Sequence, residues 1–317
     1  MKSKEIIQYI DYFCPSFLIQ PIRKYYETRV MNRIKERFQR VRITKEEITN
    51  VINNLNLDSD VFLHASTTNI GRISGGTKFL CELIQNKVDI EKHTLLVSAL
   101  PYRGKFKTYL KTNPVFDVRM APVEMGAINE YFSLYPNAKR SLHPTHSVVA
   151  IGPDAGYYVS GHHLDNTPFG IHSPYYKILG KRGKILLFGV GSNVLTFVHV
   201  IEDMLGDCFP VNPYSKKEYQ VRVFDNEGKE YVIKTPCHDP LKAIKRNGDN
   251  LMPYFLKYNA IKTCPIGDSE ISVLDARLIF YAYCQALLSG VSLYGKFKIK
   301  AKTREKILGL LDEYNSI

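Results

Sequence analysis

Short apolar runs alternate with amphipathic stretches along most of the chain. The apolar runs with few charges occupy residues 60–64, 94–97, 147–152 and 184–189. Runs of this length are typical of strands that are buried on both faces. Between them, apolar positions at helical spacing predict helices over about 125–135 and 194–205, and Thr44-Lys-Glu-Glu47 has the pattern of a capping box that begins another helix. The alternation predicts an α/β domain built on a mostly buried sheet.

The pattern changes between residues 208 and 240. Gln220-Val-Arg-Val-Phe224 and Glu230-Tyr-Val-Ile233 alternate apolar and polar positions, and Asp225-Asn-Glu-Gly228 between them is typical of a turn. We therefore expect a small antiparallel hairpin excursion from the main sheet. Downstream, Ser272-Val-Leu-Asp275 is expected to cap a last long helix that ends near Leu288 and packs against the sheet.

The first 43 residues are predicted to form a basic helical extension that precedes a domain of residues 44–317. Apolar positions between Ile6 and Phe17 are spaced for an amphipathic helix, which Pro15 and Pro21 are expected to break. A second helix, with its arginines mostly on one side, is predicted over about 24–42. Two interpretations stay open: a contact with a membrane surface or a partner protein, or a helix that packs on the body with a solvated basic face.

Composition narrows the class of protein. With 317 residues, 44% of them hydrophobic and 23% charged, the chain resembles an ordinary globular protein with room for a large core. No apolar run is long enough to span a bilayer, and the polar start Met1-Lys-Ser-Lys-Glu5 does not resemble a secretory signal. The six cysteines are scattered without a C-x-x-C pair, which favours reduced thiols over a disulfide framework or a cysteine zinc site. We therefore expect a cytoplasmic protein, either free or peripheral to the membrane.

The formal net charge of +12 is concentrated at the two ends of the chain. Residues 1–45 carry 11 Lys and Arg against 4 Asp and Glu, and residues 292–317 carry 6 against 3. The body between them is therefore nearly neutral. A nucleic-acid-binding module would combine a basic stripe with exposed aromatic residues, and none is recognisable here, so nucleic acid is not an expected partner. The basic ends fit an anionic surface or simple solvation.

Six of the nine histidines fall between residues 140 and 202. Because imidazole exchanges protons near neutral pH, this density suggests chemistry. His199 and Glu202 are three residues apart on a predicted helix and so share a face, whereas His162 and Asp165 lie in a predicted loop. Three interpretations are open from the spacing alone: a metal site, proton transfer by a histidine with a carboxylate partner, and structural hydrogen bonding.

Several short motifs occur in one order over about residues 44–290. They are Leu63-His-Ala-Ser66, Gly126-Ala-Ile-Asn-Glu130, Lys139-Arg-Ser-x-His-Pro-x-His-Ser147, His162-x-Leu-Asp165, Phe169-Gly-x-x-Ser-Pro174, Leu187-Phe-Gly-Val190 and Thr196-x-x-His-x-x-Glu202. Together they resemble the aminoglycoside 3-N-acetyltransferase family. The resemblance implies a three-layer α/β/α sandwich. It also implies direct transfer of an acetyl group from acetyl-coenzyme A to an amine, with no acyl-enzyme and no metal.

The resemblance also implies roles for individual residues. His162 matches the catalytic histidine and Glu202 the carboxylate that polarises it. A histidine of this kind is suited to removing the proton of an ammonium before the amine attacks a thioester. His199 and Asp165 are expected to support this pair or to contact the acceptor. The residues expected to bind coenzyme A, through hydrogen bonds and the charged fork of an arginine, are Ser66, Thr67, Arg140, Ser141, His143, Thr145, His146 and Ser147.

The nearly neutral charge of the body indicates which kind of acceptor to expect. A polycationic antibiotic would favour an acidic cleft, so we expect an amino sugar, nucleotide-linked amino sugars included. Two other functions stay open. One is a metal-dependent hydrolase that uses His162, His199 and Glu202, and the other is a binding protein on the same fold. The sequence fixes neither the acyl group nor the oligomeric state, and a homo-oligomer is compatible with it.

Overall fold

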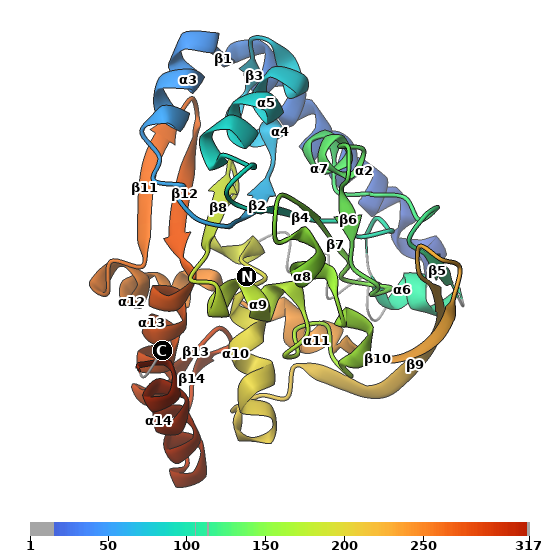
Figure 1. Cartoon of the computed structure of the whole chain (residues 1–317), viewed down its shortest axis with the longest axis vertical. Helices are drawn as coiled ribbons and strands as arrows, with labels where there is room; N and C mark the ends of the chain where they lie inside the picture. Colours follow the sequence, from blue (N-terminus) through green and yellow to red (C-terminus); the bar gives the residue numbers. More distant parts are fainter. Residues whose placement is uncertain (1–15, 105, 113, 316–317) are drawn as a thin grey trace.

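A seven-stranded mixed sheet forms the centre of the protein (Figure 1). The computed structural model describes residues 16–104, 106–112 and 114–315. In sheet order the strands are β11 (Ile261–Ile266), β12 (Ser269–Asp275), β8 (Lys184–Phe188), β2 (Val61–Ala65), β4 (Leu95–Ser98), β7 (Val148–Ile151) and β6 (Lys139–Arg140). The central strands β8, β2 and β4 run parallel, and every other neighbouring pair is antiparallel. The expected buried strands are thus confirmed.

Helices cover both faces of this sheet, because alternate residues of each strand point to opposite sides. On β2, Val61 and Leu63 pack into one core cluster and Phe62 into the other. The first face is covered by α3 (Lys45–Asn53), α5 (Gly76–Val88) and α7 (Ala127–Ser133). The second is covered by α8 (Ala155–Val159), α9 (Pro174–Gly180), α10 (Val198–Leu205), α12 (Met252–Lys257), α13 (Ala276–Leu288) and α14 (Ala301–Asn315). The expected three-layer architecture is confirmed.

The antiparallel hairpin is also confirmed, and its strands are longer than expected. Strand β9 (Tyr214–Phe224) pairs with β10 (Glu230–His238), and β5 (Val115–Asp117) adds to β9 in parallel. A separate core cluster, which includes Phe116 and Val223, stabilises this small sheet. Because β10 continues to His238, it carries that side chain back into the body of the protein. Two short helices flank the hairpin, α6 (Phe106–Lys111) and α11 (Pro240–Ile244).

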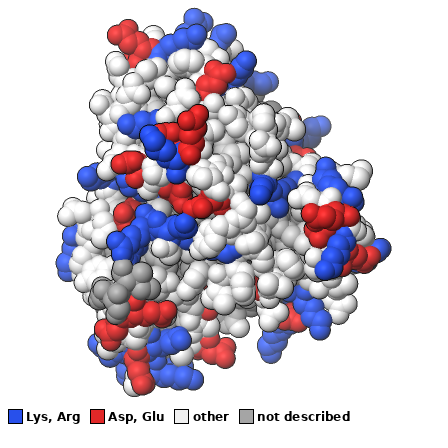
Figure 2. Space-filling view, viewed as in Figure 1, with Lys and Arg blue, Asp and Glu red and all other residues white. Residues whose placement is uncertain are grey.

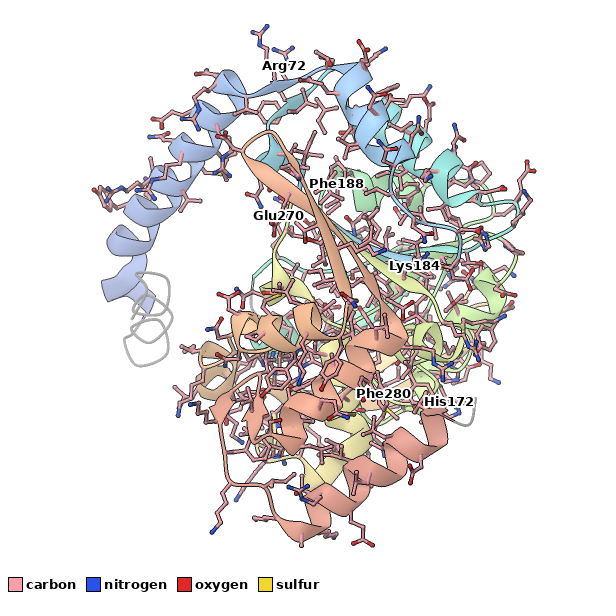
Figure 3. All side chains as sticks on the ribbon, turned by 90° about the vertical axis from the view of Figure 1, so that its left-hand side faces the viewer. Arg72, His172, Lys184, Phe188, Glu270 and Phe280 are labelled. Atoms are coloured by element: carbon pink, nitrogen blue, oxygen red, sulfur yellow. The ribbon has the colours of Figure 1, made fainter. Side chains whose placement is uncertain are left out.

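The N-terminal part differs from the expectation at Pro21. Helix α2 (Ser16–Arg40) continues through this residue. Pro21 is the sixth described residue of this helix, so its ring removes one intrahelical hydrogen bond, and the helix continues in spite of that loss. The expected helix before Pro15 lies mainly outside the described residues. Figure 3 shows α2 standing away from the body along much of its length. Near its end, the Arg37 guanidinium donates to the Asn69 carbonyl (3.2 Å) and Arg40 pairs with Asp268.

The expected boundary of the extension at residue 43 stays a prediction. Strand β1 (Arg42–Ile43) pairs in parallel with β3 (Arg72–Ile73), so the chain joins the body there. The capping box at Thr44 is confirmed, because its hydroxyl accepts from the Glu47 amide and the Glu47 carboxylate accepts from the Thr44 amide.

The expected helix from Ser272 begins later. Residues 272–275 belong to β12, and Asp275 is the N-cap of α13, where its carboxylate accepts from the amides of Arg277 and Leu278. A further helix, α14, follows, although the last helix was expected to end near Leu288. The lysine-rich composition of residues 296–306 conceals its apolar face, which Ile307 and Leu310 carry into the core.

Basic and acidic side chains intermingle on the face shown in Figure 2, in keeping with a nearly neutral body. Among the described residues, no helix combines the length and the apolar character needed to cross a membrane.

Candidate functional site

Five buried imidazoles meet on the second face of the sheet, and we call them the imidazole cluster. They are His143, His146, His162, His199 and His238. The rings of His143 and His162 stack with centroids 4.6 Å apart, and those of His199 and His238 lie 4.9 Å apart. The fifth ring, His146, lies 6.0 Å from His143, and Phe169 lies 5.0 Å from His146 and 5.1 Å from His199, so these two rings connect the pairs. The expected gathering of histidines is present, and His238 from β10 is an addition.

Within this cluster, His199 is paired with a carboxylate. Its Nδ1 donates to Glu202 Oε2 at 2.8 Å, one turn along α10. Glu202 is 1% exposed and its Oε2 also accepts from the Tyr294 hydroxyl at 3.4 Å. Burial lowers the pKa of His199, and the negative charge of Glu202 raises it by less, so the pKa stays below its ordinary value. Its Nε2 therefore holds a lone pair at neutral pH, and none of the described residues hydrogen-bonds to it.

His162 lies in a short 3₁₀ turn (His162–Leu164) and is fully buried. Its Nε2 donates to the Pro168 carbonyl at 3.0 Å, so its Nδ1 accepts from the Ser141 hydroxyl at 2.9 Å. Burial lowers the pKa of His162 to about 3. The expected pairing of His162 with Glu202 is therefore wrong in this structure, because both nitrogens of His162 are bonded elsewhere and Glu202 binds His199.

Asp165 fixes the loop that follows His162. Its two carboxylate oxygens accept from the His172 ring Nδ1 at 2.8 Å and the His172 amide at 2.9 Å. Residues 165 and 172 are thus clamped together, and the Pro168 carbonyl that holds His162 lies between them. Asp165 therefore holds the loop that carries Pro168, and its expected role in support of the catalytic pair or in contact with the acceptor stays a prediction.

Arg140 lies in β6, and four of the five N–H groups of its guanidinium donate hydrogen bonds within the protein. It donates to the carbonyls of Ala99, Ala121 and Pro122 and to the Ser147 hydroxyl. Burial lowers the pKa of Arg140 to about 10. This arrangement does not fit the expected contact with a cofactor phosphate, because no free N–H fork is presented to a ligand.

The rest of the segment after Arg140 is an internal network. Ser141, His143, Thr145 and Ser147 are fully buried. The His143 Nδ1 accepts from the His146 amide at 3.1 Å, and the Thr145 hydroxyl lies 2.9 Å from His146 Nδ1. These bonds position the imidazole cluster from within. Their burial makes the expected direct contact with coenzyme A a poor fit for this segment.

Ser66 and Thr67 have a different setting, at the carboxyl end of β2. Both are half-buried, and the Ser66 hydroxyl does not cap the short helix α4 (Thr67–Ile70) that follows. The Asn69 side chain donates to the Gly189 carbonyl (2.8 Å) at the end of the neighbouring β8. Because open α/β sheets bind ligands outside the carboxyl ends of parallel strands, this loop keeps its place as a candidate for cofactor contact.

Sequence reasoning missed the groups behind His199. Asp203 follows Glu202 on α10, and burial raises the pKa of its carboxyl to about 7. It accepts from the Tyr214 hydroxyl at 2.8 Å, and the Tyr214 ring stacks on His238 at 4.9 Å. The sequence holds no periodic signal for His238, because residues 235–238 are all buried and a bulge between Pro236 and His238 interrupts the alternation of β10.

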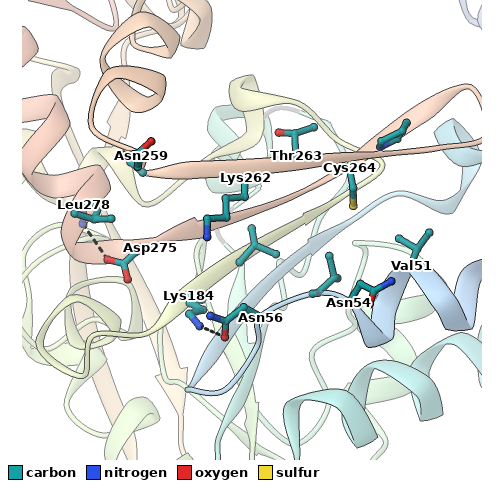
Figure 4. A pocket seen from close by; sticks show the side chains of 14 residues that line it. Val51, Asn54, Asn56, Lys184, Asn259, Lys262, Thr263, Cys264, Asp275 and Leu278 are labelled. Carbon is teal, nitrogen blue, oxygen red and sulfur yellow. Dashed lines mark hydrogen bonds between the residues drawn. The ribbon is translucent and has the colours of Figure 1, made fainter.

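A separate pocket of about 690 Å³ lies between α3 and the β11–β12 hairpin (Figure 4). Lys184, Lys262 and Asn56 line it, and Lys184 donates to Asn56. Its one carboxylate, Asp275, already caps α13. None of its lining residues is a histidine, so the pocket is separate from the imidazole cluster. Within the described ranges, no group of three or more His, Cys, Asp or Glu side chains is placed to hold a metal ion.

The place of Arg140 leads to a stability prediction. Arg140→Met should lower the free energy of unfolding by about 2–4 kcal/mol, because it removes four hydrogen bonds from a charged group and leaves the half-buried Ala121 carbonyl without its donor. Urea titration measures this. The matched control is Arg222→Met, which removes an exposed pair with Glu230 and should cost no more than about 1 kcal/mol. If Arg140→Met instead kept full stability but lost coenzyme A binding, Arg140 would have the role in coenzyme A binding that the sequence predicts.

Comparison with known proteins places the chain among characterised relatives. The family model described as aminoglycoside 3-N-acetyltransferase matches residues 62–287. Aminoglycoside N(3)-acetyltransferase III of Pseudomonas aeruginosa is 26% identical over 154 residues, which is 45% of this chain and 56% of the relative. The enzyme of the same name from Salmonella sp is 29% identical over 173 residues, 50% of this chain and 60% of the relative. The chain thus matches little more than half of the length of these curated relatives.

Solved structures share the fold over a larger part of the chain. AAC-IIIb in a binary complex with CoASH superposes with a TM-score of 0.61 at 21% identity, covering 76% of this chain and 94% of that one. AAC-VIa bound to sisomicin gives a TM-score of 0.58 at 24% identity, covering 76% and 95%. At these identities the likeness establishes the architecture.

Proposed function

Because the chain belongs to the aminoglycoside 3-N-acetyltransferase family, we propose that it transfers the acetyl group of acetyl-coenzyme A to an amino group of an amino sugar. The observation that carries the proposal is the buried His199–Glu202 pair, with Nδ1 and Oε2 at 2.8 Å. This pair lies within the segment that matches the family, together with the Ser66–Thr67 loop. The names of the relatives support the reaction class and the type of acceptor.

In the proposed reaction, the acceptor ammonium gives a proton to His199 Nε2 and its nitrogen becomes a nucleophile. The nitrogen lone pair then attacks the thioester carbon, so a C–N bond forms and the carbonyl oxygen takes the negative charge. When that intermediate collapses, the C–S bond breaks and the sulfur takes the proton from the imidazolium. The nitrogen gives up a second proton to water in this step, which leaves the neutral amide and the thiol of coenzyme A. Glu202 stabilises the imidazolium while it exists and holds the ring in the tautomer with a free Nε2.

Two histidines compete for the role of base. The family resemblance gives the role to His162, whereas the hydrogen bonds favour His199. His162 uses one nitrogen as donor and the other as acceptor within the protein, so it has no lone pair for a substrate in this arrangement. We therefore propose His199 as the general base and His162 as a residue that holds the Ser141 and Pro168 segments in place.

Ser66 and Thr67 are our proposed contacts for coenzyme A. Their hydroxyls and the following amides suit the amides and phosphates of that cosubstrate, which supplies an activated acetyl group when bound. We also propose that residues 44–317 form the catalytic domain and that residues 1–43 are an addition to it.

A direct assay tests the proposal. The purified chain is incubated with acetyl-coenzyme A and glucosamine, glucosamine 6-phosphate or sisomicin, and acetylated product is detected by mass spectrometry alongside thiol release. Product that depends on both substrates is expected, and acetyl-coenzyme A without acceptor controls for hydrolysis. If coenzyme A does not bind at millimolar concentration and no product forms, the binding-protein alternative is favoured. One tightly held transition metal per chain together with hydrolysis would favour the hydrolase.

A further inference from the structure

Arg246 lies beside the imidazole cluster without a carboxylate partner. Its Nε donates to the Tyr294 hydroxyl at 3.0 Å, and its Nη2 is buried with no hydrogen-bond partner among the described residues. No described Asp or Glu comes within ion-pair distance of this guanidinium. An arginine stays charged in proteins, and a buried charge is costly unless it is paired. The site therefore contains one cation that lacks a counter-ion.

This cation is close to the proposed base. The Tyr294 hydroxyl that accepts from Arg246 also donates to Glu202, so a single hydroxyl joins the arginine to the His199–Glu202 pair. Burial is the largest cause of the low pKa values of His146 and His238, and the positive charge of Arg246 lowers them further. These neighbours place the guanidinium among the imidazoles rather than on the outer surface.

The nearby carboxylates do not neutralise Arg246 directly. Glu202 Oε2 already binds His199 and Tyr294, and Asp203 binds Tyr214 with its pKa raised by burial to about 7. Glu202 Oε1 is buried without a partner, as is Arg246 Nη2. The site thus holds an unsatisfied acceptor on the carboxylate side and an unsatisfied donor on the guanidinium side. A ligand with both an ammonium and an anion would satisfy both.

The loop that carries Arg246 is held in place. The Asn247 amide donates to the Leu293 carbonyl (2.9 Å), and the Gly248 amide donates to the Asn193 side chain (2.8 Å). Asn193 lies in the 3₁₀ turn Ser192–Val194, which leads into α10 and His199. The segment Ser192–Val194 therefore holds the loop of Arg246 and leads into the helix of His199. A residue that determines specificity needs such a fixed position relative to the base.

We propose that Arg246 binds an anionic group, a carboxylate or a phosphate, that the acceptor carries near its reacting amine. The inference rests on the proposed function and narrows its substrate class. The planar guanidinium recognises both anions through paired N–H donors. A polycationic aminoglycoside would instead bring additional ammonium groups toward an uncompensated guanidinium. The chain should therefore prefer amino sugars that bear an acidic group.

Steady-state kinetics with three related acceptors measures this preference: glucosamine, glucosamine 6-phosphate and muramic acid, which carries a carboxylate. The ratio of kcat/KM for the better anionic acceptor to that for glucosamine should exceed one in the wild type. In Arg246→Met this ratio should fall roughly 10- to 150-fold, mainly through KM, as expected for loss of a charge-assisted hydrogen bond. Arg246→Lys should retain part of the wild-type preference for the anionic acceptor. The exposed Arg222→Met is the matched control and should keep the wild-type ratio.

The two anionic acceptors distinguish a phosphate site from a carboxylate site. Sisomicin is a fourth substrate, and wild-type turnover of sisomicin above both anionic acceptors would overturn the inference. Coenzyme A affinity is measured by calorimetry for each variant. A loss there as large as the loss for glucosamine 6-phosphate would assign Arg246 to the cosubstrate instead. An equal fall in kcat for all acceptors, with KM unaltered, would reduce Arg246 to a structural role.

Direct binding separates this inference from the proposed reaction. Calorimetry with glucosamine 6-phosphate and with muramic acid needs no turnover. If no amine is acetylated but either compound binds the wild type more tightly than Arg246→Met, the anion site stands and the transferase proposal fails. If product forms while both proteins bind these compounds equally, the transferase stands and the anion site fails. Circular dichroism of each variant verifies that it is folded.

Discussion

His199→Gln should lower kcat for acetyl transfer by about 10²- to 10⁴-fold, the usual contribution of a positioned general base. Glutamine keeps the approximate size and a hydrogen-bonding group but cannot accept the acceptor's proton. Glu202→Gln should cause a loss of the same order or smaller, because the imidazolium then forms beside a neutral amide instead of the carboxylate 2.8 Å from its Nδ1. Initial rates of thiol release give kcat, and calorimetry should show coenzyme A binding largely retained.

His162→Gln decides between the two candidate bases. It removes the bonds to Ser141 and Pro168, so we expect lower stability and a smaller loss of kcat in the folded fraction. A folded His162→Gln variant without activity, beside a nearly active His199→Gln variant, would give the role of base to His162. His93→Gln is a matched control, because it removes an imidazole that pairs with the exposed Asp58 outside the imidazole cluster.

The pH dependence of turnover adds an independent criterion. Because burial holds the pKa of His199 below its ordinary value, the imidazole is already unprotonated at pH 7. The acid limb of kcat/KM that belongs to this group should therefore lie below about pH 6.5.

The protein should lose stability steeply below about pH 6. Four fully or nearly fully buried imidazoles carry pKa values lowered first by burial, with His146 and His162 at about 3. The other two are His143 and His238. In the unfolded chain each takes a proton near pH 6.5, whereas in the folded chain it stays neutral until much lower pH. Between these values the unfolded state binds more protons, so stability falls as pH falls.

The expected slope is large. Each such imidazole contributes up to about 1.4 kcal/mol per pH unit, or about 5.5 kcal/mol per unit for four. Asp203, whose carboxyl pKa burial raises to about 7 in the folded chain, opposes them by up to about 1.4 kcal/mol per unit between about pH 7 and pH 4, which leaves a slope of about 4 kcal/mol per unit. Since typical domains have about 5–15 kcal/mol in total, unfolding should begin well above the acid range of ordinary proteins. Urea midpoints between pH 8 and pH 5 measure the slope. His238→Gln should make it shallower by one imidazole, and a flat profile in the wild type would contradict the assignment.

The sheet and its covering helices could be predicted because each apolar run and each amphipathic period is local. The same holds for the shared face of His199 and Glu202, which follows from their three-residue spacing on one helix. His162 is the opposite case. Its partners Ser141 and Pro168 are brought to it by loops, and loop conformation leaves no periodic signal in the sequence. The resemblance assigned Glu202 to His162, whereas in the structure the carboxylate of Glu202 accepts from His199.

Arg246 and Arg140 illustrate the same limit for charges. Both are single arginines in a chain with many, and the sequence cannot tell an arginine that satisfies buried carbonyls from one that has no anion nearby. Arg140 was expected to contact a phosphate because it follows a recognisable motif. Its actual partners at residues 99, 121 and 122 come from segments that the motif does not include.

The order of strands in the main sheet has a consequence for how the chain folds during synthesis. Strand β2 is made early, but its neighbour β8 follows more than a hundred residues later, and β8 is completed in turn by β12. Pairings between such distant segments raise contact order and slow folding. One side of β2 can pair with β4 as soon as that strand is made, whereas the other side stays open until β8 and then β12 have left the ribosome. A nascent chain that ends before β8 therefore exposes apolar strands without their partners, and is the stage at which this protein most needs a chaperone.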